Sequence, residues 1–463
     1  MINQNKHIAI IADWLIDFGG AELVISHLLE IFPDADIYTS VCFMNHPMLK
    51  GRRVHTSWLQ KIPFLNRRHK LAGILRPWAF RSFDLSGYDI VICSSSAESK
   101  QVAMGKWNCG KSVQMGVRGE DTVGTMMKNS TNNSKANTEG VGLPTETFDT
   151  FGYKSMKEKK PKIIVYCHTP IRYYWSHYEE YRNMMEFGIL NPIARFILDS
   201  LIGWLRKLDY EAAQRVDYFI ANSENTQERI KKYYKRESGV IYPGVSIPLT
   251  RGTQGVCPDN SEINPPTPLL RGASETENEK IYSDNKKTDL LVRKTTKHEY
   301  YISIGRCIPY KKFDLLVDTF NKNEKSLILV TNTDNRLYQT LREKSKPNIT
   351  WKLNITQEEK NTLLRGARGF LFPPLEDFGL VPIEAMALGI PVIAYGKGGA
   401  TETVIEGLTG VFFDEQTIAS LSVGIDRFEK LEFNQEKIRT HAKEFDKTIF
   451  QRKIIDFIES NVQ

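Results

Sequence analysis

The sequence predicts an α/β protein with two domains, each built on a parallel sheet that carries helices on both faces. The chain has 463 residues, more than a single hydrophobic core normally serves, so two or three domains are expected. Short apolar runs of strand length alternate with helical stretches along most of the chain, which is the pattern of parallel sheets. These runs fall into two series, and we expect one domain for each.

The predicted strands are the short apolar runs of the two series. The N-terminal series has strands at residues 7–12, 36–39, 89–93, 162–167, 218–221 and 240–242. The C-terminal series has strands at residues 300–304, 326–330, 349–351, 369–372, 391–394 and 410–413. Ligands in such folds bind beyond the carboxyl ends of the strands, so we expect the site residues in the loops that follow them.

Two long polar segments, 105–160 and 248–297, interrupt this alternation. Both have little periodicity, and loops of this length are uncommon inside compact domains, so we expect disordered insertions. Tolerated surface insertions are favoured over recognition tails. The resulting domain plan is an N-terminal domain that contains the first insertion, an inserted linker, a C-terminal domain and a helical end, at residues 1–245, 246–298, 299–435 and 436–463.

Composition excludes several classes of protein. Apolar residues make up 41% and charged residues 25% of the chain, as in ordinary globular proteins. Residues 1–6 lack the shape of a secretory signal. The sequence contains no uninterrupted run of 18 apolar residues, the length needed to span a bilayer as a helix. The six cysteines have no paired spacing, which is typical of reduced thiols. We therefore expect a cytoplasmic protein.

Residues 50–83 form the most strongly basic stretch. They contain nine Lys or Arg and no acid, interleaved with aromatic and aliphatic residues such as Trp58 and Trp78. This mixture suits an anionic membrane surface, and a solvated helical face with its own core side is an equal alternative. No nucleic-acid-binding motif accompanies the stretch, so nucleic acid is not expected as a partner.

Two carboxylates, Glu376 and Glu384, mark the loop and helix after the predicted strand at 369–372. A helix is expected to open near Pro382, because proline lacks an N–H that a first turn does not need. Gly379 allows the backbone to approach a ligand, and the free N–H groups of a helix start suit a phosphate. Glu384 has a simpler alternative as an ordinary first-turn helix carboxylate.

Two loops of the N-terminal series hold further candidates. Gly19 and Gly20 follow the first strand at a helix start, where they indicate either a phosphate cradle or a simple turn. A dinucleotide fingerprint is absent. His168 stands at the carboxyl end of the strand at 162–167, where its position favours a functional role over a structural one. Ser223 is expected to cap a helix that borders the same cleft.

Two cations, Arg306 and Lys311, follow the first strand of the C-terminal series. An Arg fork and a Lys point charge that reach into one cleft suit a pyrophosphate, whose charge must be neutralised when it leaves. Taken alone, both residues could be solvated surface cations.

Together these residues resemble the family 4 retaining glycosyltransferases of the GT-B fold. The matching pieces are Gly19-Gly-Ala-Glu22, His168-Thr-Pro170, Gly305-Arg306 with Lys311, and Glu376 through Glu384 with Phe378-Gly379. Bacterial enzymes that build O-antigen and other surface polysaccharides, many of them mannosyltransferases, are similar at residues 166–172 and 309–314. The resemblance implies two Rossmann-like domains that face an interdomain cleft, with residues 436–463 crossing back to the first domain.

The resemblance also implies roles in the C-terminal domain. Glu384 is expected to hold the ribose hydroxyls of a nucleotide, and Arg306 and Lys311 its diphosphate. Glu376 is expected to grip the donor sugar, together with three backbone N–H groups, those of Phe378, Gly379 and Leu380.

On the opposite side of the cleft, the resemblance implies that Gly19 and Gly20 contact the phosphate and sugar. His168 is expected to lie against the sugar ring near the reacting carbon. A diphosphate held by fixed cations and helix amides needs no metal. No Asp-x-Asp motif of the metal-dependent kind is evident, and Asp13 and Asp17 have the wrong spacing for one, so neither a metal site nor a cofactor is expected.

The implied function is retaining transfer of a hexosyl group from a nucleotide diphosphate sugar to a saccharide or lipid-linked saccharide in cell-surface polysaccharide synthesis. Mannose is favoured, with GDP-mannose ahead of a UDP-hexose, and the protein is expected at the inner face of the cell membrane. The alternatives are a nucleotide-sugar epimerase, a phosphorylase, which would need a pyridoxal lysine and a longer chain, and an inactive sugar-nucleotide or membrane-binding module.

Overall fold

The computed structural model describes residues 6–63, 71–105, 160–176, 178–183, 191–246 and 299–462. Of the two segments predicted to be disordered insertions, 105–160 lies outside this described part of the chain except for Gly105 and Lys160, and 248–297 lies wholly outside it.

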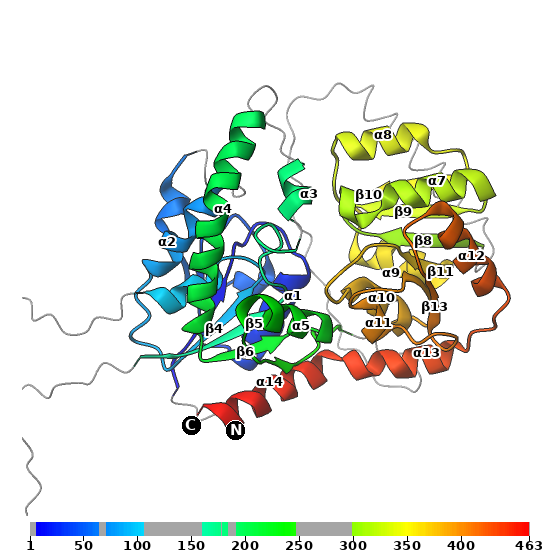
Figure 1. Ribbon diagram of the computed structural model, residues 1–463. Helices are drawn as coiled ribbons and strands as arrows, with labels where there is room; N and C mark the ends of the chain where they lie inside the picture. Colours follow the sequence, from blue (N-terminus) through cyan, green and yellow to red (C-terminus); the bar gives the residue numbers. More distant parts are fainter. Residues whose placement is uncertain are drawn as a thin grey trace, which may run out of the picture.

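Two parallel sheets form the two halves of the molecule, as the sequence predicts (Figure 1). Within the described residues, the N-terminal sheet has seven strands in the order β3-β2-β1-β4-β5-β6-β7. They are β1 (Ile8–Ala12), β2 (Asp36–Thr39), β3 (Val54–Thr56), β4 (Ile90–Ser95), β5 (Lys162–Cys167), β6 (Tyr218–Ala221) and β7 (Gly239–Val240). Every neighbouring pair is parallel, with Ile10, for example, opposite Ile37 and Ile92.

The C-terminal sheet has six described strands in the order β10-β9-β8-β11-β12-β13, again all parallel. They are β8 (Tyr300–Ile304), β9 (Leu327–Thr331), β10 (Ile349–Leu353), β11 (Ala367–Phe372), β12 (Val392–Tyr395) and β13 (Gly410–Phe413). Each of these matches a predicted strand within about two residues, as is usual for element ends. The sequence did not predict β3, because its three residues are partly or fully exposed and form no apolar run.

Helices cover both sheets. The α-helices of the N-terminal half are α1 (Gly20–Ile31), α2 (Arg76–Arg81), α3 (Tyr178–Asn183), α4 (Asn191–Gln214) and α5 (Glu224–Tyr234). Those that follow are α7 (Phe313–Asn323), α8 (Arg336–Lys344), α9 (Gln357–Gly366), α10 (Leu380–Ala387), α11 (Ala400–Thr403), α12 (Ile418–Glu429), α13 (Gln435–Ala442) and α14 (Lys447–Asn461). Short 3₁₀ turns are η1 (Pro47–Leu49), η2 (Trp58–Lys61), η3 (Leu71–Ile74), η4 (Ser99–Met104), η6 (Pro309–Lys311) and η7 (Lys443–Phe445).

Each sheet is buried on both faces, which explains the continuous apolar runs of its strands. Because successive side chains of a strand point to opposite faces, Ile10 lies in one hydrophobic cluster and Ile11 in another. The cluster around Ile10 also contains residues of α1 and α14, so the last helix of the chain belongs to the N-terminal core.

The end of the chain crosses from one half to the other, and α13 and α14 run beneath both sheets (Figure 1). Phe450, Ile454 and Ile458 recur every four residues and bury one face of α14. At the crossing, a Cβ on Gly244 would lie 2.4 Å from the Cα of Lys447, so only glycine fits this close approach. The two connections between the halves therefore lie side by side.

Candidate active site

The candidate site lies at the carboxyl ends of the C-terminal strands, where the loop after β11 meets η6 after β8. Oε1 of Glu376 lies 2.6 Å from Nζ of Lys311, and Oε2 lies 3.7 Å from Nη2 of Arg172. Burial alone would raise the pKa of Glu376, but the cations of Lys311 and Arg172 outweigh it and hold that pKa below its ordinary value. Glu376 is therefore ionised at neutral pH.

Local packing explains why the Glu376 loop takes this shape. Gly379 has φ +92°, and a Cβ there would lie 2.7 Å from the ring of Phe372, so glycine is needed. The N–H of Gly399, from the loop after β12, donates to the carbonyl of Glu376 at 2.9 Å. Gly379 is also the N-cap of α10 and provides no capping side chain, so the N–H groups at the helix start stay available. The helix opens at Leu380, two residues before the predicted position near Pro382.

Arg306 and Glu384 flank this centre. Arg306 is exposed in the loop after β8 and lies near enough to lower the pKa of Glu376 and that of Glu22. Glu384 extends from α10 and accepts a hydrogen bond from Nζ of Lys360 in α9 at 2.9 Å. The two predicted carboxylates thus have different cationic partners.

The diglycine loop meets the C-terminal domain. A Cβ on Gly20 would lie 3.0 Å from Cδ1 of Leu380, so the start of α1 faces the start of α10 across the interface. The N–H of Gly19 donates to Oε2 of Glu22 at 3.0 Å. Burial raises the pKa of Glu22 to about 7, in spite of this hydrogen bond and of Arg306. Glu22 belongs to the matching motif but is not among the predicted site residues. Its burial and its raised pKa are properties of the folded protein, so the sequence does not reveal them.

His168 follows β5 and is partly buried. Its Nε2 lies 2.8 Å from Oγ of Ser94 at the end of β4, and its ring packs against Tyr166 with centroids 5.3 Å apart. Burial lowers the pKa of His168 to about 4, so the ring is neutral at physiological pH. At that pH it can offer a hydrogen bond or a contact surface, not a positive charge. The expected N-cap also forms, since Oγ of Ser223 accepts from the N–H of Thr226 at 3.0 Å.

Sequence reasoning missed a set of residues that joins the two halves beside Glu376. Asp377 is only 3% exposed and contacts Arg172, Asn225 and Arg229 of the N-terminal domain. Glu402 of α11 accepts from backbone N–H groups at the start of α5. Asp377 is adjacent to a predicted residue, but no sequence signal pairs it with a residue 205 positions away.

The basic stretch 50–83 lies partly outside the described residues, since 64–70 are not among them. Several of its described cations bind the protein itself. Arg52 donates to the carbonyls of Leu29 and Met48, Arg76 pairs with Glu98 at 2.8 Å, and Arg81 donates to Gln101. The membrane prediction therefore rests on the exposed residues Lys50, Trp58, Lys61, Ile74 and Trp78, and on Arg53, which is exposed but has its Nε 2.6 Å from Oδ1 of Asp36. No helix in the described part of the chain is long and apolar enough to cross a membrane.

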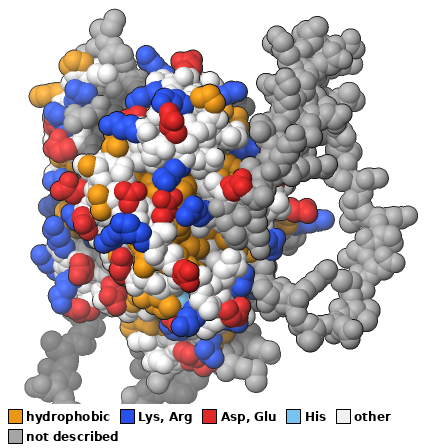
Figure 2. Space-filling view, turned by 90° about the vertical axis from the view of Figure 1, so that its right-hand side faces the viewer, with side chains coloured by type: hydrophobic (Ala, Val, Ile, Leu, Met, Phe, Trp, Pro, Cys, Tyr) orange, Lys and Arg blue, Asp and Glu red, His pale blue; other side chains and the backbone are white. Residues whose placement is uncertain are grey.

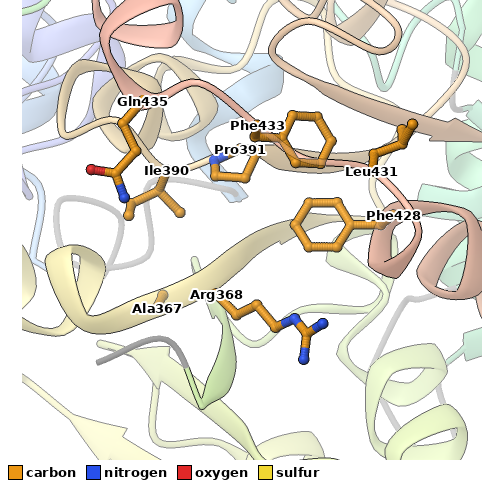
Figure 3. Close-up of a pocket in the computed structure, with 8 residues that line it drawn as sticks. All are labelled: Ala367, Arg368, Ile390, Pro391, Phe428, Leu431, Phe433 and Gln435. Atoms are coloured by element: carbon orange, nitrogen blue, oxygen red, sulfur yellow. The ribbon is translucent and has the colours of Figure 1, made fainter. Parts of the chain in front are cut away.

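A separate cavity of 180 Å³ lies at the other edge of the C-terminal sheet (Figure 3). It is lined by Ala367 and Arg368 at the start of β11, by Ile390 and Pro391 just before β12, and by Phe428, Leu431, Phe433 and Gln435. The start of β11 and the residues before β12 are the amino ends of these strands, so the cavity is not part of the Glu376 site.

Positive and negative side chains are interspersed over the outer face of the C-terminal domain (Figure 2). Within the described residues, no group of three or more His, Cys, Asp or Glu is placed to hold a metal ion.

Comparison with known proteins adds an independent finding. Residues 288–445 match the model of the family described as Glycosyl transferases group 1. The matched part of the chain contains the whole C-terminal sheet, from β8 to β13, and is similar to this family.

The curated relatives of this chain are distant. It is 35% identical to the alpha-1,3/1,6-mannosyltransferase alg-2 of Neurospora crassa over 100 residues, 21% of each chain. It is 24% identical to alg2 of Schizosaccharomyces pombe over 260 residues, 54% of this chain and 47% of that protein. The uncharacterized glycosyltransferase MJ1178 of Methanocaldococcus jannaschii is 25% identical over 168 residues, 34% and 46% of the two chains. The matches thus span less than half the length of these relatives.

Solved structures resemble the chain over nearly its whole length. Anabaena Alr3699/HepE in complex with UDP and glucose has a TM-score of 0.61 at 15% identity, over 98% of this chain and 100% of that one. Sucrose-phosphate synthase of Thermosynechococcus elongatus has a TM-score of 0.59 at 15% identity, over 98% and 99%. At this identity the likeness concerns the fold alone, and that fold is GT-B, as the sequence resemblance implied.

Proposed function

We propose that the protein is a retaining, metal-independent hexosyltransferase that moves a mannosyl group from a nucleotide diphosphate sugar to a saccharide or lipid-linked saccharide. The observation that carries this proposal is the contact between Lys311 and Glu376 beside the uncapped start of α10. A cation, a carboxylate and free helix N–H groups then converge at the carboxyl edge of a parallel sheet. That combination suits a sugar joined to a diphosphate.

The proposed donor contacts divide between leaving group and sugar. Lys311 and Arg306 bind the diphosphate, assisted by the N–H groups of Phe378, Gly379 and Leu380. Glu384 binds the ribose hydroxyls, and Glu376 binds hydroxyls of the sugar. When the diphosphate enters, Lys311 exchanges part of its contact with Glu376 for phosphate oxygens, which frees the carboxylate to accept from the sugar.

The N-terminal domain completes the proposed site. Gly19 and Gly20 leave room for the donor phosphate and sugar, since neither has a side chain. His168, neutral at physiological pH, lies against the sugar ring near the reacting carbon. The closed arrangement, in which Gly20 faces Leu380, keeps out water that would hydrolyse the donor.

The proposed reaction is a front-face substitution. The bond between the anomeric carbon and the β-phosphate oxygen breaks, and the electron pair leaves with the diphosphate. An acceptor hydroxyl oxygen forms the new bond on the same face, and its proton passes to the departing phosphate oxygen. Fixed cations and amides stabilise the negative charge that develops on the diphosphate, which is where preorganised electrostatics contributes most to catalysis.

Mannose is proposed because several curated relatives are named alpha-1,3/1,6-mannosyltransferases. As the donor, GDP-mannose is favoured over a UDP-hexose by the motif resemblance, although the HepE structure holds UDP and glucose. For the acceptor, Phe18 and Phe43 expose aromatic rings in the loops after β1 and β2, and such rings suit stacking against a saccharide. A role in bacterial surface polysaccharide synthesis at the inner membrane face follows from the motif resemblance.

Donor binding and product analysis test this proposal. Calorimetry against GDP-mannose, UDP-glucose and UDP-galactose is expected to give tightest binding for GDP-mannose, without added divalent metal. Nuclear magnetic resonance of the product is expected to show the same anomeric configuration as the donor. Isomerised sugar formed in the absence of acceptor would instead identify an epimerase, and an absence of turnover with all donors would indicate a binding module.

A further inference from the structure

Asp377 uses both of its carboxylate oxygens to bind residues of the opposite domain. Its Oδ2 accepts from Nε of Arg172 at 2.9 Å and from Nη2 of the same guanidinium. Its Oδ1 accepts from Nδ2 of Asn225 at 3.3 Å and from Nη1 of Arg229. All these donors belong to the N-terminal domain, so the carboxylate keeps its partners only while the domains are closed.

Glu402 makes a second contact across the same interface, at the start of α5. Its two oxygens accept from the N–H groups of Glu224 at 2.7 Å and Asn225 at 2.9 Å. A carboxylate at a helix N-terminus is stabilised by the free N–H groups and the helix dipole. Unlike Asp377, Glu402 lies on a helix after β12 and shares no cation with Glu376.

Arg172 links the Asp377 contact to the candidate active site. Its Nη2 lies 3.7 Å from Oε2 of Glu376, and its guanidinium lies over the ring of Tyr310, 5.5 Å from the centroid. A guanidinium is planar and rigid, so a carboxylate that binds its Nε edge also sets the direction of its Nη atoms. The orientation of Arg172 toward Glu376 is therefore determined by Asp377.

The two cations at Glu376 come from different domains. Lys311 belongs to the C-terminal domain and stays near Glu376 whether the domains are open or closed. Arg172 belongs to the N-terminal domain and reaches Glu376 only on closure. Glu376 thus keeps a cationic neighbour in the closed state even when Lys311 turns toward a diphosphate.

We propose that Asp377 is a positioning residue that couples domain closure to the sugar-binding carboxylate, by holding Arg172 in the orientation that faces Glu376. Glu402 stabilises closure without acting on Glu376. This inference rests on the proposed function, because it takes Glu376 to contact the donor sugar. Arg229 binds the other oxygen of Asp377 and provides a second comparison on the same carboxylate.

The test compares Asp377→Asn and Arg172→Lys with Glu402→Gln and Arg229→Gln. Domain closure is measured by double electron–electron resonance between spin labels attached at exposed positions of the two domains, such as those of Lys235 and Lys430. All four variants are expected to lower the closed fraction. The variants are then compared at saturating donor and at the same closed fraction. Under these conditions Asp377→Asn and Arg172→Lys are expected to have a kcat about ten- to a hundredfold below that of Glu402→Gln and Arg229→Gln, as for small misplacements of a catalytic group.

Donor KM separates the two roles further. Glu402→Gln and Arg229→Gln are expected to change KM and kcat only as far as closure changes, and a higher donor concentration restores their rate. Equal kcat losses for Asp377→Asn and Glu402→Gln at equal closure would overturn the positioning role. An unchanged distance distribution in Asp377→Asn would overturn the coupling to closure.

Two further outcomes keep this inference apart from the proposed function. If the wild-type protein turns over no donor while Asp377→Asn still opens the molecule, the proposed function fails and with it the catalytic half of the inference. If wild-type transfer is active and Asp377→Asn retains the wild-type kcat, only the inference fails. Should Asp377→Asn unfold, as judged by circular dichroism, Arg172→Lys keeps the charge and decides the same question.

Discussion

Nζ of Lys311 and Oε1 of Glu376 lie 2.6 Å apart, so a cation and a carboxylate from the loops after two neighbouring strands, β8 and β11, meet at one edge of the C-terminal sheet. Lys311 is the main electrostatic partner of Glu376, since it contributes most to lowering the pKa of that carboxyl against its burial. A diphosphate donor would enter between an existing cation and an existing anion. This relationship leads to the first prediction.

Lys311→Ala is expected to lower kcat by about a hundred- to a thousandfold, because it removes a preorganised charge from the leaving group. Glu376→Ala is expected to abolish transfer while the thermal unfolding midpoint stays near that of the wild type. Transfer rates with saturating donor are the measurement. Lys322→Ala, at an exposed position of α7, is the matched control and should keep full activity. Near wild-type turnover in either site variant would show that the site is wrongly assigned.

Glu384→Gln is expected to weaken nucleotide binding by about ten- to a hundredfold, since a hydrogen bond to a charged group contributes roughly 1.5–3 kcal/mol. Lys360→Met removes the present partner of Glu384 and is expected to leave binding equal or tighter. Calorimetry with GDP measures both. If the Lys360 variant lost as much affinity as the Glu384 variant, the ion pair itself would be needed, and Glu384 would not act as the ribose ligand.

Gly20→Val is expected to hinder domain closure. A Cβ at this position already lies 3.0 Å from Leu380, and the added methyl groups cannot be accommodated by moving one flexible side chain. We expect kcat to fall by about a hundredfold, as for a misplacement near 1 Å, with nucleotide binding to the C-terminal domain preserved. Gly87→Ala is the control, because a Cβ there meets no atom within 4 Å. Unchanged kcat in Gly20→Val would mean that closure at this point is not needed.

The pKa of Glu22, about 7 against an ordinary 4.5, predicts a pH-dependent stability. The folded protein holds the proton more tightly than the unfolded chain, so stability attributable to this group falls as pH rises from 4.5 to 7, by about 3 kcal/mol. Glu22→Gln is expected to remove this slope and to stabilise the protein above pH 7. Urea unfolding at several pH values checks it. Parallel wild-type and variant curves would exclude the buried carboxyl as the cause.

His168 has the opposite effect on the acid side. Its pKa is lowered from 6.5 to about 4, so the folded state binds fewer protons than the unfolded chain between these values. Stability attributable to His168 is complete above pH 6.5 and is lost as pH falls toward 4. His168→Gln is expected to make the free energy of unfolding fall less steeply as pH is lowered from 6.5 to 4. Glu22→Gln is expected to make the free energy of unfolding rise more steeply with pH than in the wild type. The free energy of unfolding is measured against pH for each variant. Slopes that change in opposite directions in the two variants separate the contribution of His168 from that of Glu22.

The sequence by itself determined the elements of the fold. Apolar runs buried on both faces predict their strands locally, and the loops after β8 and β11 could be recognised because cations and carboxylates follow those strands directly. Burial within one element leaves a periodic signal along the chain. By contrast, β3 is exposed and short, so it left no such signal.

Only the tertiary structure decided how the two domains meet. Arg172 and Asp377 are 205 positions apart, and Gly20 lies against Leu380 of the other half although 360 positions separate them in the chain. Contacts of this kind depend on the docking of rigid domains, which has no local pattern in the chain. The same holds for Glu22, because the burial that raises its pKa, against the lowering effect of the hydrogen bond from Gly19, arises only in the folded protein.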